Sequence, residues 1–277
     1  MSTTPVTTER RVPRGRMSKR QRARLVRIGV YVLTVLVVVF LLVKIDWTKL
    51  QETFLDPEIF RAQFPDVITQ AARNTLIFTF FAFTGGLALG LILALMKLSS
   101  IRFYRVVATV YVEVFRGLPA LVTLIIVGFV LPIALQVKIP GTYGPGSVGL
   151  AVVAAAYMAE TLRAGIEAVP KGQMEAARSL GMGRGRALFS IVIPQAFRII
   201  LPPLTNEFVL LIKDTSLIFV LGTTEATIEL TKFGRDAVSD TFNGTPIIVV
   251  ALVYLLITIP LTQLVAALER RGKRATR

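Results

Sequence analysis

Six ionisable side chains interrupt the long apolar runs of this sequence. They are Glu113, Arg116, Glu160, Glu207, Lys213 and Asp214. An unpaired charge at membrane depth is costly, so such groups usually face a cavity or a partner. Glu160 and Glu207 can accept hydrogen bonds from an ammonium group, whereas Lys213 or Arg116 can donate to a carboxylate. We therefore predict a pathway for a molecule that carries both charges, lined by Glu160, Asn206, Glu207, Lys213 and Asp214.

The same charges also have a structural explanation. Glu113 and Arg116 are three residues apart and could pair on one helix face. We interpret Arg116, Gly117 and Pro119 as an interfacial kink in the chain. Lys213 and Asp214 could satisfy a helix end, and for Glu207 the pathway role and the structural role both stay open.

Two adjacent prolines, Pro202 and Pro203, remove backbone donors from the fifth apolar run, and Thr205 and Asn206 follow at once. Prolines at membrane depth are tolerated where the backbone is packed in protein or lines a water-filled cavity. We predict a hinge or a kink that lines the substrate pathway, with a static kink as the alternative.

A charged, glycine-bearing segment, Val169–Gly181, lies between two apolar runs. It is too polar to span a membrane and too short to be a domain, so we expect it at the membrane surface. A turn at 171–173 and a short helix from Glu175 are predicted, and Gly181 can supply a stop at positive φ. From the residues alone, the segment could be held by a partner or rest on lipid headgroups.

Composition indicates a membrane protein. Hydrophobic residues make up 53% of the 277 residues and charged residues 18%. The net charge of +15 is concentrated beside apolar runs, with nine basic residues between Arg10 and Arg27 and five between Arg270 and Arg277. This placement is typical of anchors on membrane lipid rather than of nucleic-acid binding.

Several kinds of chemistry are excluded by the residues that are missing. Cysteine and histidine are absent from the sequence, which removes disulfides, thiol catalysis, the usual zinc sites and histidine proton relays. The phosphate-binding pattern GxxxxGK[ST] is also absent. We therefore expect no metal, no cofactor and no catalysis on this chain.

The apolar runs predict an all-α integral membrane protein with six spans, at about 28–44, 75–96, 120–135, 147–162, 199–212 and 246–268. A separate apolar helix at 106–115 precedes the third span, with Arg116–Pro119 between them. Gly85, Gly86 and Gly90 should let the second span approach a neighbour closely. The expected organisation is a basic tail (1–27), an extra N-terminal span (28–44), an external amphipathic segment (45–70), the main transmembrane domain (71–268) and a second basic tail (269–277).

Charge placement predicts the orientation of these spans. Six spans put both termini on one side, together with the loops 97–105 and 163–198, and these four segments hold 23 of the 32 basic residues. The segments 44–73 and 213–240, on the other side, each carry more acidic than basic residues. The positive-inside rule therefore predicts cytoplasmic termini and a cytoplasmic 163–198 loop.

The spacing of Glu175-Ala176-Ala177, three residues, Gly181, nine residues, then Ile191 and Pro194 resembles the cytoplasmic EAA loop of ABC-importer permeases. One departure is Ile193, where that pattern prefers leucine. Over roughly residues 70–268 the chain also resembles the polar amino acid subfamily, through the blocks 113–119, 156–163, 194–196 and 213–217. The N-terminal span and the 45–73 segment resemble a longer permease of actinobacterial glutamate importers.

This resemblance implies a type I, MetI-like permease core that imports a polar amino acid such as glutamate, glutamine or aspartate. It implies that the 163–198 loop docks a cytoplasmic ATPase dimer, which would itself use ATP and Mg²⁺. The residues carried over to this docking role are Gly172, Glu175, Ala176, Ala177, Gly181, Ile191 and Pro194. A second permease, identical or different, and an external solute-binding protein would complete the system.

A self-contained transporter driven by an ion gradient is the alternative. Such a transporter would be expected to contain inverted repeats and an ion site at the midplane of the membrane. The sequence shows no obvious internal repeat.

Overall fold

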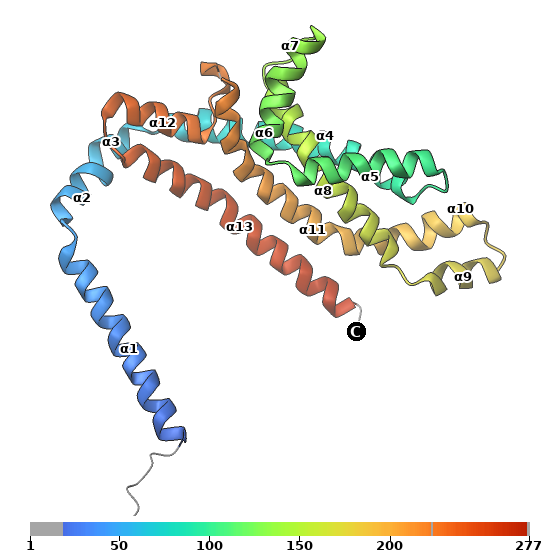
Figure 1. Ribbon diagram of the computed structural model, residues 1–277, viewed down its shortest axis with the longest axis horizontal. Coiled ribbons are helices and arrows are strands. Elements are labelled where there is room, and N and C mark those ends of the chain that lie inside the picture. Colours follow the sequence, from blue (N-terminus) through green and yellow to red (C-terminus); the bar gives the residue numbers. More distant parts are fainter. Residues whose placement is uncertain (1–18, 223, 276–277) are drawn as a thin grey trace, which may run out of the picture. The chain divides into compact units, whose positions relative to one another are not determined.

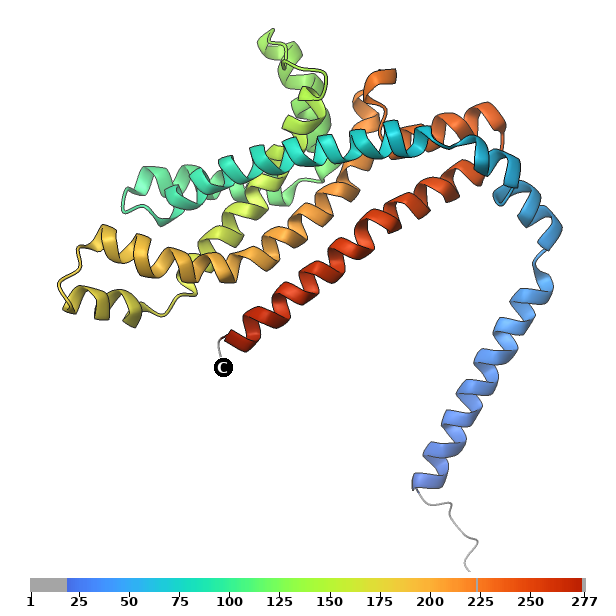
Figure 2. The same ribbon diagram turned by 180° about the vertical axis from the view of Figure 1, so that it is seen from behind.

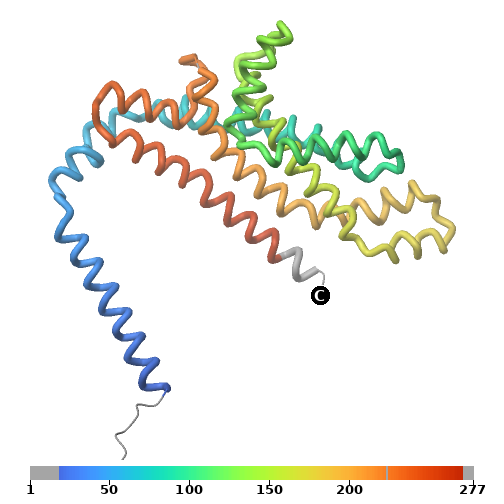
Figure 3. The backbone as a smooth tube through the Cα atoms, viewed as in Figure 1, coloured from blue at the N-terminus to red at the C-terminus, as the bar shows by residue number. Residues whose placement is uncertain are grey.

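The computed structural model describes residues 19–222 and 224–275, with side chains up to residue 270 (Figure 3). Every element assigned in these ranges is helical, as the sequence predicted. The chain divides after Glu52 into two units, which we describe separately.

The first unit consists of α1 (Lys19–Lys44) and most of α2 (Trp47–Phe54). α1 contains the predicted N-terminal span, but the helix already includes residues 19–27, which the sequence assigned to the basic tail. Arginine and lysine are good helix formers, so the helix extends past the apolar run. The remainder of that tail, residues 1–18, lies outside the described residues. No residue of α1 is buried.

The second unit holds the remaining helices (Figure 1). They are α3 (Pro57–Ala62), η1 (Val67–Ala72), α4 (Arg73–Leu98), α5 (Arg102–Gly117), α6 (Ala120–Ile125), η2 (Ile126–Val130), α7 (Leu131–Leu135), α8 (Gly144–Glu167), α9 (Lys171–Ser179), α10 (Arg184–Ala187), η3 (Leu188–Val192), α11 (Ile193–Asp214), η4 (Thr215–Leu221), η5 (Glu225–Thr227), α12 (Leu230–Thr241) and α13 (Thr245–Ala275).

Five helices of the described part are long and apolar enough to cross a membrane. They are Lys19–Lys44, Val67–Leu98, Gly144–Glu167, Arg184–Leu221 and Thr245–Arg270. The apolar helix predicted at 106–115 and the third span predicted to about residue 135 form a pair of helices, 102–117 and 120–135, bent by 113°. Leu118 is extended because the residue before a proline avoids helical angles, so α5 ends there. The bend falls at the residues for which the sequence predicted a kink.

Glycines bring α4 and α8 into close contact, and the two helices cross when the molecule is seen from behind (Figure 2). A Cβ atom added at Gly90 would lie 3.0 Å from Cβ of Met158 and 3.1 Å from the carbonyl oxygen of Ala155. One added at Gly86 would lie 3.0 Å from Cβ of Ala154. The expectation of close helix approach at these glycines is confirmed.

A second close contact joins α8 to α11. A Cβ atom added at Gly165 would lie 2.1 Å from Cγ1 of Ile200, two residues before the first proline of α11. α11 contains both Pro202 and Pro203 and is helical throughout. The two prolines therefore do not end the helix, and a hinge or kink at them stays a prediction.

The segment between η4 and α12 is bound to the start of α4 by side chains. Asn74, 2% exposed, donates to the carbonyls of Ala226 (3.0 Å) and Ile228 (2.9 Å) and accepts from the hydroxyl of Tyr143 (2.8 Å). The hydroxyl oxygen of the buried Thr75 accepts from the backbone N–H of Leu230 at 3.1 Å. These bonds satisfy backbone groups that no helix ladder could satisfy.

Glu229 completes this connection as the N-cap of α12. Its fully buried carboxylate accepts from the backbone N–H groups of Thr231 and Lys232, each at 2.7 Å. Burial raises the pKa of the Glu229 carboxyl above its ordinary value of 4.5, and the two N–H donors oppose that rise.

Candidate functional site

Two carboxylates of α11 line one cavity in the second unit. Glu207 and Asp214 are seven residues apart, which is about two helical turns, so both lie on one face. The cavity has a volume of about 320 Å³ and is completed by residues of α8 and by Leu118 at the bend. Within the described residues, neither carboxylate forms an ion pair or a hydrogen bond, so both are available to a ligand.

Tyr157 of α8 also lines this cavity. The guanidinium of Arg116 lies 5.5 Å from the centre of the Tyr157 ring, within the range of a cation–π contact. Arg116, predicted as part of the kink, therefore lies next to the cavity as well. Sequence reasoning missed Tyr157, although it is the one aromatic residue of the predicted span 147–162.

The ion pair weighed for Glu113 and Arg116 is not formed among the described residues. Both side chains are exposed, and Arg116 contacts Tyr157 on the neighbouring helix instead. An exposed pair gains little from Coulomb attraction, so contact with an aromatic ring competes easily.

Glu160 lies in a different environment from Glu207 and Asp214. One carboxylate oxygen accepts from Lys97 at the end of α4 (2.5 Å), and the other accepts from Arg163 (2.8 Å). Arg163 also pairs with Glu167. The charge of Glu160 is thus compensated by two cations, and its side chain does not line the cavity.

The remaining residues predicted for the pathway lie on α11 but outside the cavity. Asn206 and Lys213 are both exposed, and neither lines the cavity. Lys213 forms no ion pair with Asp214 within the described part of the chain. The structure therefore brings together only the two acidic members of the predicted α11 set.

The loop that contains the Glu175-Ala176-Ala177 triplet forms a helical hairpin of α9 and α10. α9 begins at Lys171, directly after Pro170, so the turn predicted at 171–173 is wrong. The fixed φ of Pro170 suits entry into a helix, which lets α9 start early. At its end Gly181 has φ +82°, as predicted, and the backbone N–H groups of Gly181 and Met182 donate to Arg178 and Ala177 in a Schellman motif.

Some side chains of this loop are buried against the rest of the second unit, and others are exposed. Ala177 is buried and Ile191 is half-buried, and Met174 packs on the main core. The residues of the docking set that are exposed are Gly172, Glu175, Ala176, Gly181 and Pro194. Two large apolar side chains are also open, with Leu180 85% and Phe189 70% exposed. Exposed apolar side chains on a polar surface segment are available for contact with another protein or with lipid.

Residues 86–274 match a family described as binding-protein-dependent transport system inner membrane component. The chain is 36% identical over 200 residues to the probable glutamine ABC transporter permease protein GlnM of Bacillus subtilis (strain 168), covering 72% of this chain and 89% of that protein. It is 36% identical over 189 residues to the arginine transport system permease protein ArtQ of the same organism, covering 68% and 84%.

A solved structure is also similar. The crystal structure of an amino acid ABC transporter with histidines superposes with a TM-score of 0.66 at 38% sequence identity, covering 77% of this chain and 94% of that chain.

Proposed function

This chain belongs to the binding-protein-dependent family of inner membrane transport components, as a membrane-spanning permease of an amino acid ABC importer, and we propose that the cavity between α8 and α11 receives its substrate. The predicted fold, a type I MetI-like permease core, is confirmed by the family match and the solved structure. The family is a transport subunit rather than an enzyme, and in such importers a separate ATPase hydrolyses ATP. These matches favour the ABC importer and lend no support to the alternative of a transporter driven by an ion gradient.

The proposal rests on one observation: Glu207 and Asp214 line the same cavity, and within the described residues neither carboxylate forms an ion pair or a hydrogen bond. Glu207 and Asp214 can accept hydrogen bonds from the α-ammonium group of an amino acid, or from a cationic side chain. Tyr157, which lines the cavity, and Arg116, which lies beside it against the Tyr157 ring, can donate to the α-carboxylate. The ammonium group and the carboxylate of the bound amino acid would thus each have a hydrogen-bonding partner in this chain.

The charge of the cavity bears on which amino acid passes. Two carboxylates attract a net cation and repel a net anion, and the partly buried position strengthens this effect. We therefore favour a neutral or cationic polar amino acid, such as the glutamine or arginine named for the relatives. Glutamate, expected from the longer N-terminal region, and aspartate are the competing candidates.

Uptake by the reconstituted importer, with its ATPase and binding protein, tests this proposal. We expect Asp214→Asn and Glu207→Gln each to lower arginine or glutamine uptake at least tenfold while ATPase binding is kept. Glu113→Gln, which removes an exposed carboxylate of α5, is the matched control. Uptake unchanged in both cavity variants, or glutamate transported in preference to arginine and glutamine by the wild type, would contradict the proposal.

The remaining organisation follows from the charge placement and from the open hairpin. We propose that both termini and the 163–198 loop are cytoplasmic and that α9 docks the ATPase dimer. A second permease, identical or different, would close the pathway opposite this chain, and an external binding protein would deliver the substrate.

A further inference from the structure

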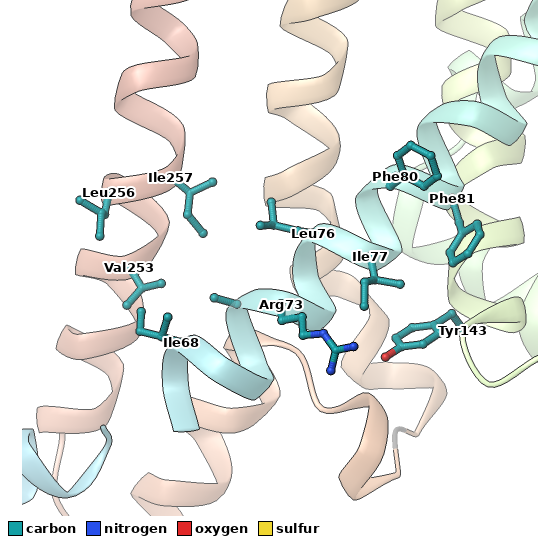
Figure 4. Close-up of a pocket in the computed structure, with 11 residues that line it drawn as sticks. Ile68, Arg73, Leu76, Ile77, Phe80, Phe81, Tyr143, Val253, Leu256 and Ile257 are labelled. Atoms are coloured by element: carbon teal, nitrogen blue, oxygen red, sulfur yellow. The ribbon is translucent and has the colours of Figure 1, made fainter. Parts of the chain in front are cut away.

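A groove in the second unit combines an apolar lining with a single charge. It lies between α4 and α13 and has a volume of about 820 Å³. Figure 4 shows Leu76, Ile77 and Phe80 of α4 on one wall, with Leu256 and Ile257 of α13 on the other. Arg73 is the only charged residue that lines it.

The guanidinium of Arg73 is the polar group left available in this groove. Within the described residues, its side chain forms no ion pair or hydrogen bond. Figure 4 shows it on the side of the Tyr143 hydroxyl, which donates to Asn74 at 2.8 Å. A planar guanidinium presents paired N–H donors that match the oxygens of a phosphate.

The depth of the lining residues suits a lipid. Arg73 stands near the start of the span Val67–Leu98, where a cation can reach the headgroup level. Phe81 is eight residues further along, or about 12 Å at the usual helical rise, and so lies within the hydrocarbon. The groove therefore has a cation at its interfacial end and hydrocarbon contacts along its length.

Other occupants of the groove fit less well. The described part of α1 contains no acidic residue, so it could not pair with Arg73. A second copy of this chain would have to bring an acidic side chain to Arg73, and among the residues that line the groove none is acidic, so a symmetric contact through this face alone offers Arg73 no partner. We propose that this groove binds one phospholipid, with its phosphate on Arg73 and an acyl chain along α4 and α13.

The test is to count the lipid that remains bound to the complete importer after purification in mild detergent. Native mass spectrometry should show one phospholipid per permease, lost at least fivefold in Arg73→Gln and in Leu256→Trp, which fills the groove. The controls are Arg61→Gln, an exposed cation on α3, and Leu95→Trp, an exposed apolar position elsewhere on α4. Retained ATPase shows that each variant is folded. Equal lipid in wild type and groove variants would overturn the proposal.

Disulfide cross-linking tests whether a protein segment occupies the groove instead. The chain contains no cysteine of its own, so only introduced cysteines could form a disulfide. Leu256→Cys is combined with Val35→Cys for α1 and is used alone for a second copy. We expect no disulfide in either case. Efficient cross-linking in the membrane would show that a helix fills the groove and would also overturn the proposal.

Discussion

Two connecting segments at opposite ends of α4, 224–230 and the hairpin of α9 and α10, differ in their hydrogen bonds and in how far their apolar side chains are buried. The segment 224–230 is bonded to buried side chains of α4, above all Asn74, and Glu229 caps the helix that follows. The hairpin of α9 and α10 ends in a turn that local backbone bonds hold, and it leaves Leu180 exposed, as η3 directly after it leaves Phe189. The polar groups of the first segment, the completed end, are hydrogen-bonded within the chain. The second segment, the open end, leaves apolar side chains exposed, which fits our proposal that a partner protein covers it.

The largest effect on stability is expected at the completed end. Asn74→Leu would leave two carbonyls and the hydroxyl of Tyr143 without partners, and each unsatisfied buried group costs about 1–3 kcal/mol. We expect a loss of several kcal/mol, seen as a large fall in the melting temperature of the purified permease. Gln70→Leu, which removes one exposed bond to the carbonyl of Glu225, is the control and should change little. Similar melting temperatures for both variants would remove the contrast.

At the open end, we expect loss of a partner without loss of stability. Leu180→Ser should weaken binding of the ATPase about tenfold or more, as truncation of an interface anchor does. The melting temperature of the isolated permease should be unchanged because the side chain is already exposed. Glu175→Arg should act in the same direction in a co-purification assay, with Glu225→Arg as the control at the other end. A destabilised permease that still binds ATPase would reverse the assignment.

The turn that ends α9 offers a smaller test. Gly181→Ala places a side chain at φ +82°, which costs about 1 kcal/mol. Because no neighbour lies within 4 Å of the added Cβ atom, this cost is purely conformational. We expect a small fall in melting temperature and a shift in ATPase affinity, with Gly183→Ala, which is also open but extended, as the control.

The smallest effect concerns pH at the completed end. Because the native pKa of Glu229 is raised, the folded state binds its proton more tightly than the unfolded state. This group therefore favours folding at low pH, and its contribution falls as pH rises from about the ordinary 4.5 through the native pKa. Glu229→Gln should flatten the pH dependence of the melting temperature in this window. Glu225→Gln should leave that dependence as it is in the wild type.

The sequence predicted the features that depend on neighbouring residues. Apolar runs gave the spans, Gly86 and Gly90 the close contact, and Gly181 the positive φ. Glu207 and Asp214 could be placed on one face from their spacing alone. The ion pair of Glu160 with Lys97 could not be predicted, because Lys97 is distant in the chain and reaches Glu160 only through the packing of α4 on α8. The angle at Pro119 likewise depends on how two short helices pack.

The close contact of α4 with α8 has a consequence for transport. At Gly86 and Gly90 the two helices leave no room for even an added Cβ atom, so sliding or rotating one past the other would cause a clash, and we expect α4 and α8 to move together as one body. The contact of Gly165 with Ile200 attaches the first turns of α11 to the same body. Glu207 and Asp214 lie beyond Pro202 and Pro203, where α11 meets the same body through side chains, such as the Phe208 ring centred 5.2 Å from that of Phe83 on α4. A bend of α11 at the two prolines would remake these side-chain contacts and carry the two carboxylates toward or away from the wall formed by α8.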